Sequence, residues 1–237
     1  AAARGPLHSV ARSQHARGRD RDAPNTSAMS QTARGCVFFY GHRKGEHAAF
    51  SQFYGPIEFA DEDGNTYNCA EQYMMAAKAR VMGDTKTLAQ ILACDYNPTA
   101  IKQMGRRVTP YSEEKWVAAR LECVTHGNFL KFSQNAKLRK TLMQTGDLTL
   151  VEAAPSDRIW GIGRSVNDAA AGASWQGQNL LGKALMAARA MIESGQKRFE
   201  AAPAAAEAAA AADAAEEAAE EEAEPRPKKQ RSGEKSK

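Results

Sequence analysis

An acid and an amine lie seven residues apart in the segment EQYMMAAKA, as Glu71 and Lys78. Seven residues make about two helical turns, so on a helix both side chains share one face, roughly 10 Å apart along the axis. Desolvation makes a lysine amine available as a nucleophile, and a buried neutral glutamate can donate a proton. Glu71 also fits a helix cap, and Lys78 also fits a solvated surface chain. Spacing alone favours these ordinary roles.

A second candidate group is Asp157 with Trp160, Gly161 and Gly163. Glycines let a ligand approach the backbone closely, and the tryptophan ring could stack on a base. A tryptophan between such glycines is also common in a protein core. The GxG pattern is a weak signal by itself, and the residues alone favour a core position for Trp160.

A third candidate is the segment from Gly177 to Gly182, which contains Asn179 at the start of the last expected helix. Free N–H groups at a helix N-terminus suit a phosphate, although Asn179 also fits a plain N-cap. Further cations could line a phosphate-bearing substrate or simply face water. They are Arg106, Arg107, Lys115, Arg120, Lys131, Lys137, Arg139 and Lys140.

The composition excludes several classes of protein. The 237 residues carry a net charge of +4, and no stretch approaches the ~18–20 apolar residues of a membrane span. The four cysteines form no CxxC pair and suit no zinc template. No Ser-His-Asp arrangement, P-loop or HExxH motif is present. We therefore expect no membrane segment, no metal and no cofactor.

Charge and complexity divide the chain into three parts. Residues 1–34 contain six arginines and few large apolar residues, so we expect them to be disordered; they faintly resemble an organelle transit peptide. Residues 35–194 form one expected domain. Residues 195–237 are an Ala/Glu-rich tail ending in a basic cluster that fits nuclear import. We expect an intracellular protein, nuclear or cytoplasmic, with organelle import left open.

The expected elements of the domain are mostly helices. Strands are expected at Val37–Tyr40 and Leu148–Glu152, and a hairpin within Gly55–Tyr67. Helices are expected from Asn68 to Gly83, over Asp84–Ala93 and Pro98–Met104, after a Ser112 cap, over Asn135–Thr145 and after Asn179. The helix after Ser112 is long. The residues that recur on one of its faces are Trp116, Arg120, Cys123, Gly127 and Leu130. This pattern predicts a compact, helix-rich α+β domain.

Taken in order, the motifs resemble the NADAR superfamily, the group that contains the YbiA-type N-glycosidases. The resemblance covers roughly residues 37–192 and departs at Gln52, where the family often has Asn. The motifs are FFY (38–40), AFSQFY (49–54), CAEQYMMAAKA (69–79), MGRR (104–107), Trp116, KFSQN (131–135), LVEAAPSDRIWGIG (150–163) and GQNLLGKALM (177–186).

The resemblance implies hydrolysis of an N-glycosidic bond at ribose C1′, a reaction that needs no metal. We also expect the protein to be a monomer. Two substrate classes go with the resemblance: ADP-ribose on guanine, including guanine in DNA, and phosphoribosylamino-pyrimidines of riboflavin synthesis. A non-catalytic module that binds ADP-ribose is a further alternative. In the first case Lys78 would form a Schiff base with the opened ribose, and Glu71 and Asp157 would be its acidic neighbours. The implied substrate-binding residues are Phe39, Arg43, Ser51, Arg106, Trp116, Trp160, Gly161, Gly163 and Asn179.

Overall fold

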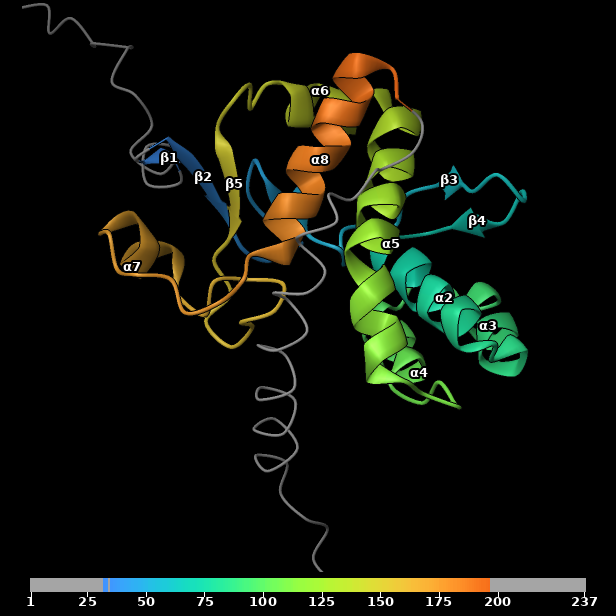
Figure 1. Cartoon of the computed structure of the whole chain (residues 1–237). Coiled ribbons are helices and arrows are strands. Elements are labelled where there is room, and N and C mark those ends of the chain that lie inside the picture. Colours follow the sequence, from blue (N-terminus) through green and yellow to red (C-terminus); the bar gives the residue numbers. More distant parts are fainter. Residues whose placement is uncertain (1–31, 34, 197–237) are drawn as a thin grey trace, which may run out of the picture.

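A long central helix, α5 (Glu113–Gln134), organises the structure, a computed structural model that describes residues 32–33 and 35–196. It packs against α2 (Ala70–Met82) on one side and α8 (Leu180–Ser194) on the other, as Figure 1 shows. Ser112 caps α5 by accepting a hydrogen bond from the Lys115 N–H at 3.3 Å. These three helices enclose most of the core.

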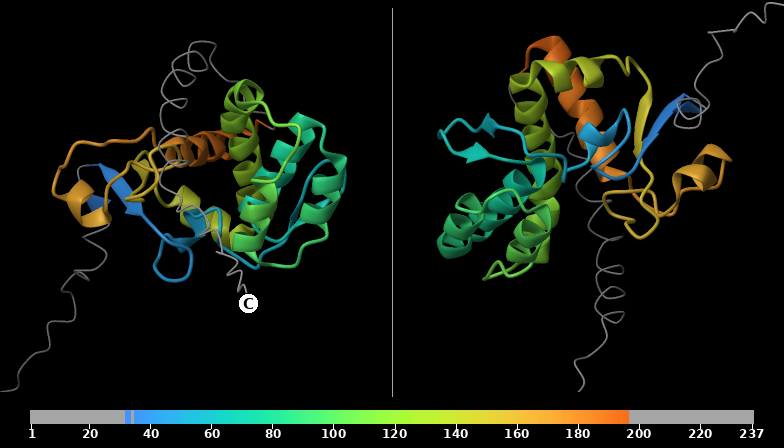
Figure 2. Two further views of the ribbon diagram at one scale, coloured as in Figure 1. Left: turned by 90° about the horizontal axis from the view of Figure 1, so that it is seen from below. Right: turned by 180° about the vertical axis from the view of Figure 1, so that it is seen from behind.

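A small sheet lies against the outer side of α8. Strand β2 (Cys36–Phe39) is parallel to β5 (Thr149–Glu152) and antiparallel to β1 (Thr32–Ala33), giving the order β1-β2-β5. The carboxyl ends of β2 and β5 meet at the edge of the sheet from which the 153–165 segment departs. Figure 2 shows from two further sides that this sheet and the α2–α4 helices lie at opposite ends of the domain.

The other elements surround this framework. The DEDGN turn connects β3 (Phe59–Ala60) and β4 (Thr66–Tyr67) into a hairpin, and α3 (Thr85–Leu92) and α4 (Pro98–Gly105) pack beside α2. The bounds of the remaining elements are η1 Ala48–Phe50, α6 Ala136–Met143 and α7 Val166–Ala170. The expected helix-rich α+β fold is confirmed; η1 and α7 were not expected. The expectations for residues 1–31, 34 and 197–237 lie outside the described residues, whereas 32–33 form a strand.

The start of α2 differs from the expected capping box. The helix begins after Cys69, which makes no side-chain cap bond. Gln72 reaches back instead, its Oε1 accepting a hydrogen bond from the Asn68 N–H at 2.7 Å. Glu71 is thereby released from capping and is buried.

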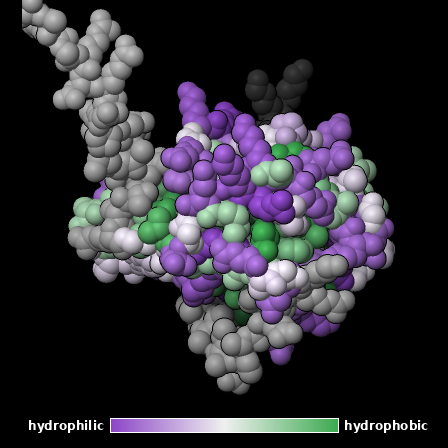
Figure 3. Space-filling model, turned by 90° about the horizontal axis from the view of Figure 1, so that it is seen from above, coloured by the Kyte–Doolittle hydropathy of each residue, from purple (hydrophilic) through white to green (hydrophobic). Residues whose placement is uncertain are grey.

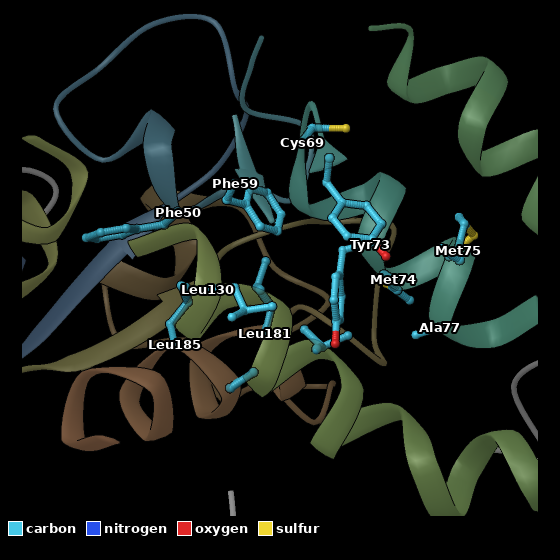
Figure 4. Close-up of a cluster of buried hydrophobic side chains, with 14 of the residues drawn as sticks. Phe50, Phe59, Cys69, Tyr73, Met74, Met75, Ala77, Leu130, Leu181 and Leu185 are labelled. Carbon is cyan, nitrogen blue, oxygen red and sulfur yellow. The ribbon is translucent and has the colours of Figure 1, made fainter. Parts of the chain in front are cut away.

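The main core gathers aromatic and aliphatic side chains between α2, α5 and α8. Figure 4 shows Phe50, Phe59 and Tyr73 meeting Leu130 and Leu181 there. The face drawn in Figure 3 is mostly hydrophilic, with small scattered apolar areas. Among the described residues, no helix is long and apolar enough to cross a membrane. Within the same part of the chain, no three His, Cys, Asp or Glu side chains gather as a metal site.

Candidate active site

A cavity of about 380 Å³ opens between α2, α4, α5 and the segment 156–160. Its walls are markedly cationic and aromatic. The lining residues are Met74, Met75, Lys78, Lys102, Gly105, Arg106, Trp116, Arg120, Ser156, Asp157, Arg158, Ile159 and Trp160. The volume lies at the lower end of the ~300–1,000 Å³ typical of small-molecule sites.

The close approach of α4 to α2 helps to form this cavity. A Cβ atom on Gly105 would lie 1.8 Å from the Sδ atom of Met75, so no larger residue fits there without a shift. The contact brings Lys102 and Arg106 of the α4 segment to the cavity that Lys78 of α2 also lines. Gly105 therefore belongs to the packing between the two helices.

Lys78 lies at this cavity between two aromatic rings. Its Nζ atom is 4.3 Å from the centroid of the Tyr111 ring and 5.8 Å from that of Trp116. Trp116 is buried, so its ring is a fixed wall. The amine is therefore held at the cavity by one aromatic face from the loop before α5 and one from its first turn, as cation–π attraction favours.

Asp157 shapes the opposite wall through one of its oxygens. Its Oδ1 accepts backbone hydrogen bonds from Ile159 at 3.0 Å, Trp160 at 2.7 Å and Gly161 at 3.3 Å. Gly161 is needed for packing, because a Cβ there would lie 2.9 Å from Ala154 Cβ and from backbone oxygens. The expected GxG loop is thus a tight turn that presents Asp157 and Trp160 to the cavity.

Two buried carboxyl groups lie beside Asp157. Burial raises the pKa of Glu71 to about 7, with Asp157 adding to the rise and Lys102 opposing it. Burial also raises the pKa of Glu152 to about 8, again with Asp157 adding and Lys102 opposing. The Oε2 atom of Glu152 is buried and makes no hydrogen bond within the described part of the chain. Both groups can therefore hold a proton near neutral pH.

Asn179 serves packing and does not line the cavity. Its Oδ1 accepts a hydrogen bond from the Glu152 N–H at 3.0 Å, and its Nδ2 donates to the Leu150 oxygen at 2.9 Å. Its φ of 54° places it in the left-handed region, and its side chain caps no N–H of α8. A Cβ on Gly182 would lie 2.1 Å from the Leu150 oxygen. This segment therefore anchors the end of β5, from which Glu152 projects.

The structure brings together some of the expected site residues and separates others. Six line the cavity: Lys78, Arg106, Trp116, Arg120, Asp157 and Trp160. Glu71 is buried and interacts electrostatically with Lys78, Arg106 and Asp157.

The remaining expected binding residues lie elsewhere. Phe39 packs edge-on against Phe50 at 5.5 Å in the core. The Ser51 Oγ accepts from the Phe53 N–H at 3.2 Å, outside the cavity. Gly163, with φ of 63°, packs against Arg158, and Arg43 lines a different hollow.

Sequence reasoning missed Glu152, Lys102 and Arg158. Glu152 had a usable signal, because it ends an expected buried strand directly before the Asp157 turn. Lys102 and Arg106 are four residues apart and so share a helix face. Arg158 carried no signal beyond its place next to Asp157.

The fold and site define a helix-rich α+β protein whose cationic cavity holds an amine beside carboxyl groups. The sequence profile of the NADAR domain matches residues 38–193, and the chain belongs to this family, which confirms the resemblance. N-glycosidase R617 of Acanthamoeba polyphaga mimivirus is 44% identical over 161 residues, covering 65% of this chain and 94% of the relative.

Other relatives are less similar to this chain. N-glycosidase YbiA of Escherichia coli is 28% identical over 148 residues, covering 62% of this chain and 82% of the relative. The NMR structure of E. coli YbiA superposes with a TM-score of 0.57 at 25% identity, covering 73% of this chain and 93% of the other. Protein irg-1 of Caenorhabditis elegans is 37% identical over 123 residues, covering 50% of this chain and 58% of the relative.

Proposed function

We propose that the protein is an N-glycosidase that releases ADP-ribose from guanine, with Lys78 as the nucleophile. The observation that carries the proposal is the placement of the Lys78 amine in one cavity with Asp157 and two tryptophans. The relatives named N-glycosidase support the reaction type. Glu71, buried close enough to interact with Lys78, supplies the acid.

The cations of the cavity favour a substrate with several phosphate oxygens. Lys102, Arg106, Arg120 and Arg158 all line it. Guanidinium groups bind phosphate oxygens in pairs, and a pyrophosphate offers more such oxygens than a single phosphate does. Trp116 and Trp160 add rings on which a base can stack. This combination supports ADP-ribose over a monophosphate riboside.

The first step opens the ribose ring. The carboxyl group of Glu71 gives its proton to the ring oxygen as the C1′–O4′ bond breaks, and C1′ becomes an iminium carbon bonded to the guanine nitrogen. The Asp157 carboxylate stabilises the positive charge. Because the pKa of Glu71 is about 7, the acid form needed for this step is populated at neutral pH.

The second step exchanges one nitrogen for another. The neutral Lys78 amine attacks C1′, its surplus proton passes to the guanine nitrogen, and the C1′–guanine bond breaks. The protein then holds the sugar as a lysine imine. Water adds to C1′ and gives one proton back to the Glu71 carboxylate. Its other proton passes to the amine as the C1′–Nζ bond breaks, and the aldehyde closes onto its own O4′ hydroxyl. One water is consumed, and guanine and ADP-ribose are released.

A product assay tests this proposal. The full chain would be incubated in parallel with ADP-ribosylated guanosine, ADP-ribosylated DNA and a phosphoribosylamino-pyrimidine, and released ADP-ribose or ribose phosphate measured by mass spectrometry. We expect cleavage of the guanine adducts. Cleavage of the pyrimidine alone would overturn the substrate assignment, and tight binding of ADP-ribose without any product would favour a binding module.

A further inference from the structure

A second hollow of about 560 Å³ lies at the N-terminal end of α4. It shares no lining residue with the cavity described above. It combines partly buried aromatic rings with an exposed arginine. Its lining residues are His42, Arg43, Phe53, Tyr54, Gly55, Pro56, Tyr96, Asn97, Pro98 and Thr99. Rings beside a guanidinium are suited to a nucleobase and its phosphate.

Hydrogen bonding and packing hold these rings in place. The Tyr96 hydroxyl donates to the Phe53 carbonyl at 2.8 Å, and the His42 and Phe53 ring centroids are 5.7 Å apart. A Cβ on Gly55 would lie 2.6 Å from the Tyr96 ring, so the backbone packs directly onto that ring. The aromatic wall is therefore a preformed surface.

The guanidinium of Arg43 makes the hollow electropositive. Burial lowers the pKa of His42, and the Arg43 charge lowers it further. The same charge opposes the rise that burial causes in the pKa of Tyr96. Both effects place the positive charge close to two lining residues.

One face of α4 joins this hollow to the active-site cavity. Pro98, Lys102 and Arg106 recur every four residues; the first lines the hollow and the other two line the cavity. Eight residues of helix span about 12 Å. An extended phosphate-bearing ligand could therefore follow a cationic face from one site to the other.

We propose that this hollow is a subsite for a nucleoside phosphate, with the base on the Phe53 and Tyr96 rings and the phosphate on Arg43. The identity of the connected ligand rests on the proposed function. The active-site cavity, at about 380 Å³, is small for a ligand with two nucleosides. The occupant is either the far nucleoside of ADP-ribose or the neighbouring nucleotide of a DNA strand.

The test compares Arg43→Glu with Lys44→Glu, which changes an exposed neighbour outside the lining by the same charge. Calorimetry would measure the affinity of AMP, ADP-ribose and ribose 5-phosphate for the full chain. KM would be measured for ADP-ribosylated guanosine and for an ADP-ribosylated five-nucleotide single strand. Thermal unfolding would check that both variants fold.

We expect Arg43→Glu to lower the affinity for AMP at least tenfold relative to Lys44→Glu. If the affinity for ADP-ribose falls by a matching factor while that for ribose 5-phosphate falls less than threefold, the hollow binds the substrate's far nucleoside. A tenfold rise in KM confined to the oligonucleotide assigns it to the neighbouring nucleotide. Changes below threefold with every probe overturn the subsite. The binding measurements need no turnover, so failed cleavage would refute the proposed function and leave this result interpretable.

Discussion

The amine of Lys78 lies 4.3 Å from the centroid of the Tyr111 ring, which belongs to the loop before α5. Lys78 itself belongs to α2, so two separate elements of the chain position the proposed nucleophile. A ring face attracts the ammonium form by about 0.5–2 kcal/mol and holds it in one place. Tyr111 is thus a candidate positioning residue for Lys78.

Replacing the amine should abolish turnover and leave ligand binding in place. We expect Lys78→Ala to retain less than a tenth of the wild-type rate on ADP-ribosylated guanosine, because no imine can form, while ADP-ribose still binds. Borohydride reduction during turnover, followed by mass spectrometry, should locate a sugar adduct on Lys78. Lys86→Ala, an exposed lysine on α3, is the matched control. Undiminished activity of Lys78→Ala, or an adduct elsewhere, contradicts the imine.

The activity should decline as the pH rises above about 7. Burial raises the pKa of Glu71 to about 7, and the proposed first step requires its protonated form. Above this pH each unit removes about tenfold of the acid form, so kcat should fall in proportion. Glu71→Gln should lower kcat by about 10²–10⁴-fold and should abolish the decline of kcat above pH 7.

Asp157→Asn is the comparison for the acid assignment, since it alters the other carboxyl group of the proposal. If kcat of Glu71→Gln still declines above pH 7 and kcat of Asp157→Asn does not, then Asp157 is the acid and Glu71 stabilises the positive charge. The measurement is kcat from pH 5 to 9 for both variants.

The sequence predicted those parts of the site that depend on local periodicity. Glu71 and Lys78 were placed on one helix face because seven residues span two turns, and both prove to adjoin the cavity region. The strand ending at Glu152 was also expected, as was a Gly-rich loop after Asp157, but the turn that Asp157 itself closes was not. The periodicity of the long helix placed Trp116 on its recurring face, whereas its expected role in the site came from the family resemblance.

The rest depends on tertiary packing that no local pattern records. Glu71 was also a capping candidate, and only the structure shows Gln72 making that bond. Asn179 had the signal of a ligand site, yet it bonds the backbone of β5. Lys102 reaches the cavity because Gly105 lets α4 pack on Met75, a contact between separate helices.

Neutralising Glu152 should remove a pH dependence of stability. Burial raises its pKa to about 8 from an ordinary 4.5, so between these values the folded protein binds more protons than the unfolded chain. The free energy of unfolding therefore falls as pH rises through this window, by up to about 1.4 kcal/mol per unit. We expect Glu152→Gln to flatten this slope and to stabilise the protein at pH 8 in urea unfolding. An unchanged slope would contradict the buried acid.

Lys131 should show the opposite sign. It is fully buried, and its Nζ donates to the Ser51 carbonyl at 3.0 Å. Burial lowers its pKa to about 7 from 10.5, so between these values the unfolded chain binds more protons. Its contribution makes the free energy of unfolding rise with pH from 7 to 10, by up to about 1.4 kcal/mol per unit.

Lys131→Met should reduce that rise, since methionine has no proton to bind. Lys137→Met, on α6, is the control and should leave the slope as in the wild type. Denaturant unfolding at pH 7, 8.5 and 10 measures the difference. A wild-type slope in Lys131→Met would show that the amine stays charged in the folded protein.

The crossing of α2 and α5 should not tolerate a methyl group at Gly127. A Cβ there would lie 2.4 Å from Tyr73 Cδ1, and Tyr73 is buried against Tyr67, with ring centroids 5.0 Å apart. Alanine improves helix propensity by about 1 kcal/mol over glycine, so an open site would be stabilised. Overpacking costs about 1–3 kcal/mol and should prevail, because the tyrosine ring is surrounded by the rings of Phe59, Tyr67 and His126. We expect Gly127→Ala to lower Tm, with differential scanning calorimetry as the measurement; a rise in Tm would mean that the two helices can separate at little cost.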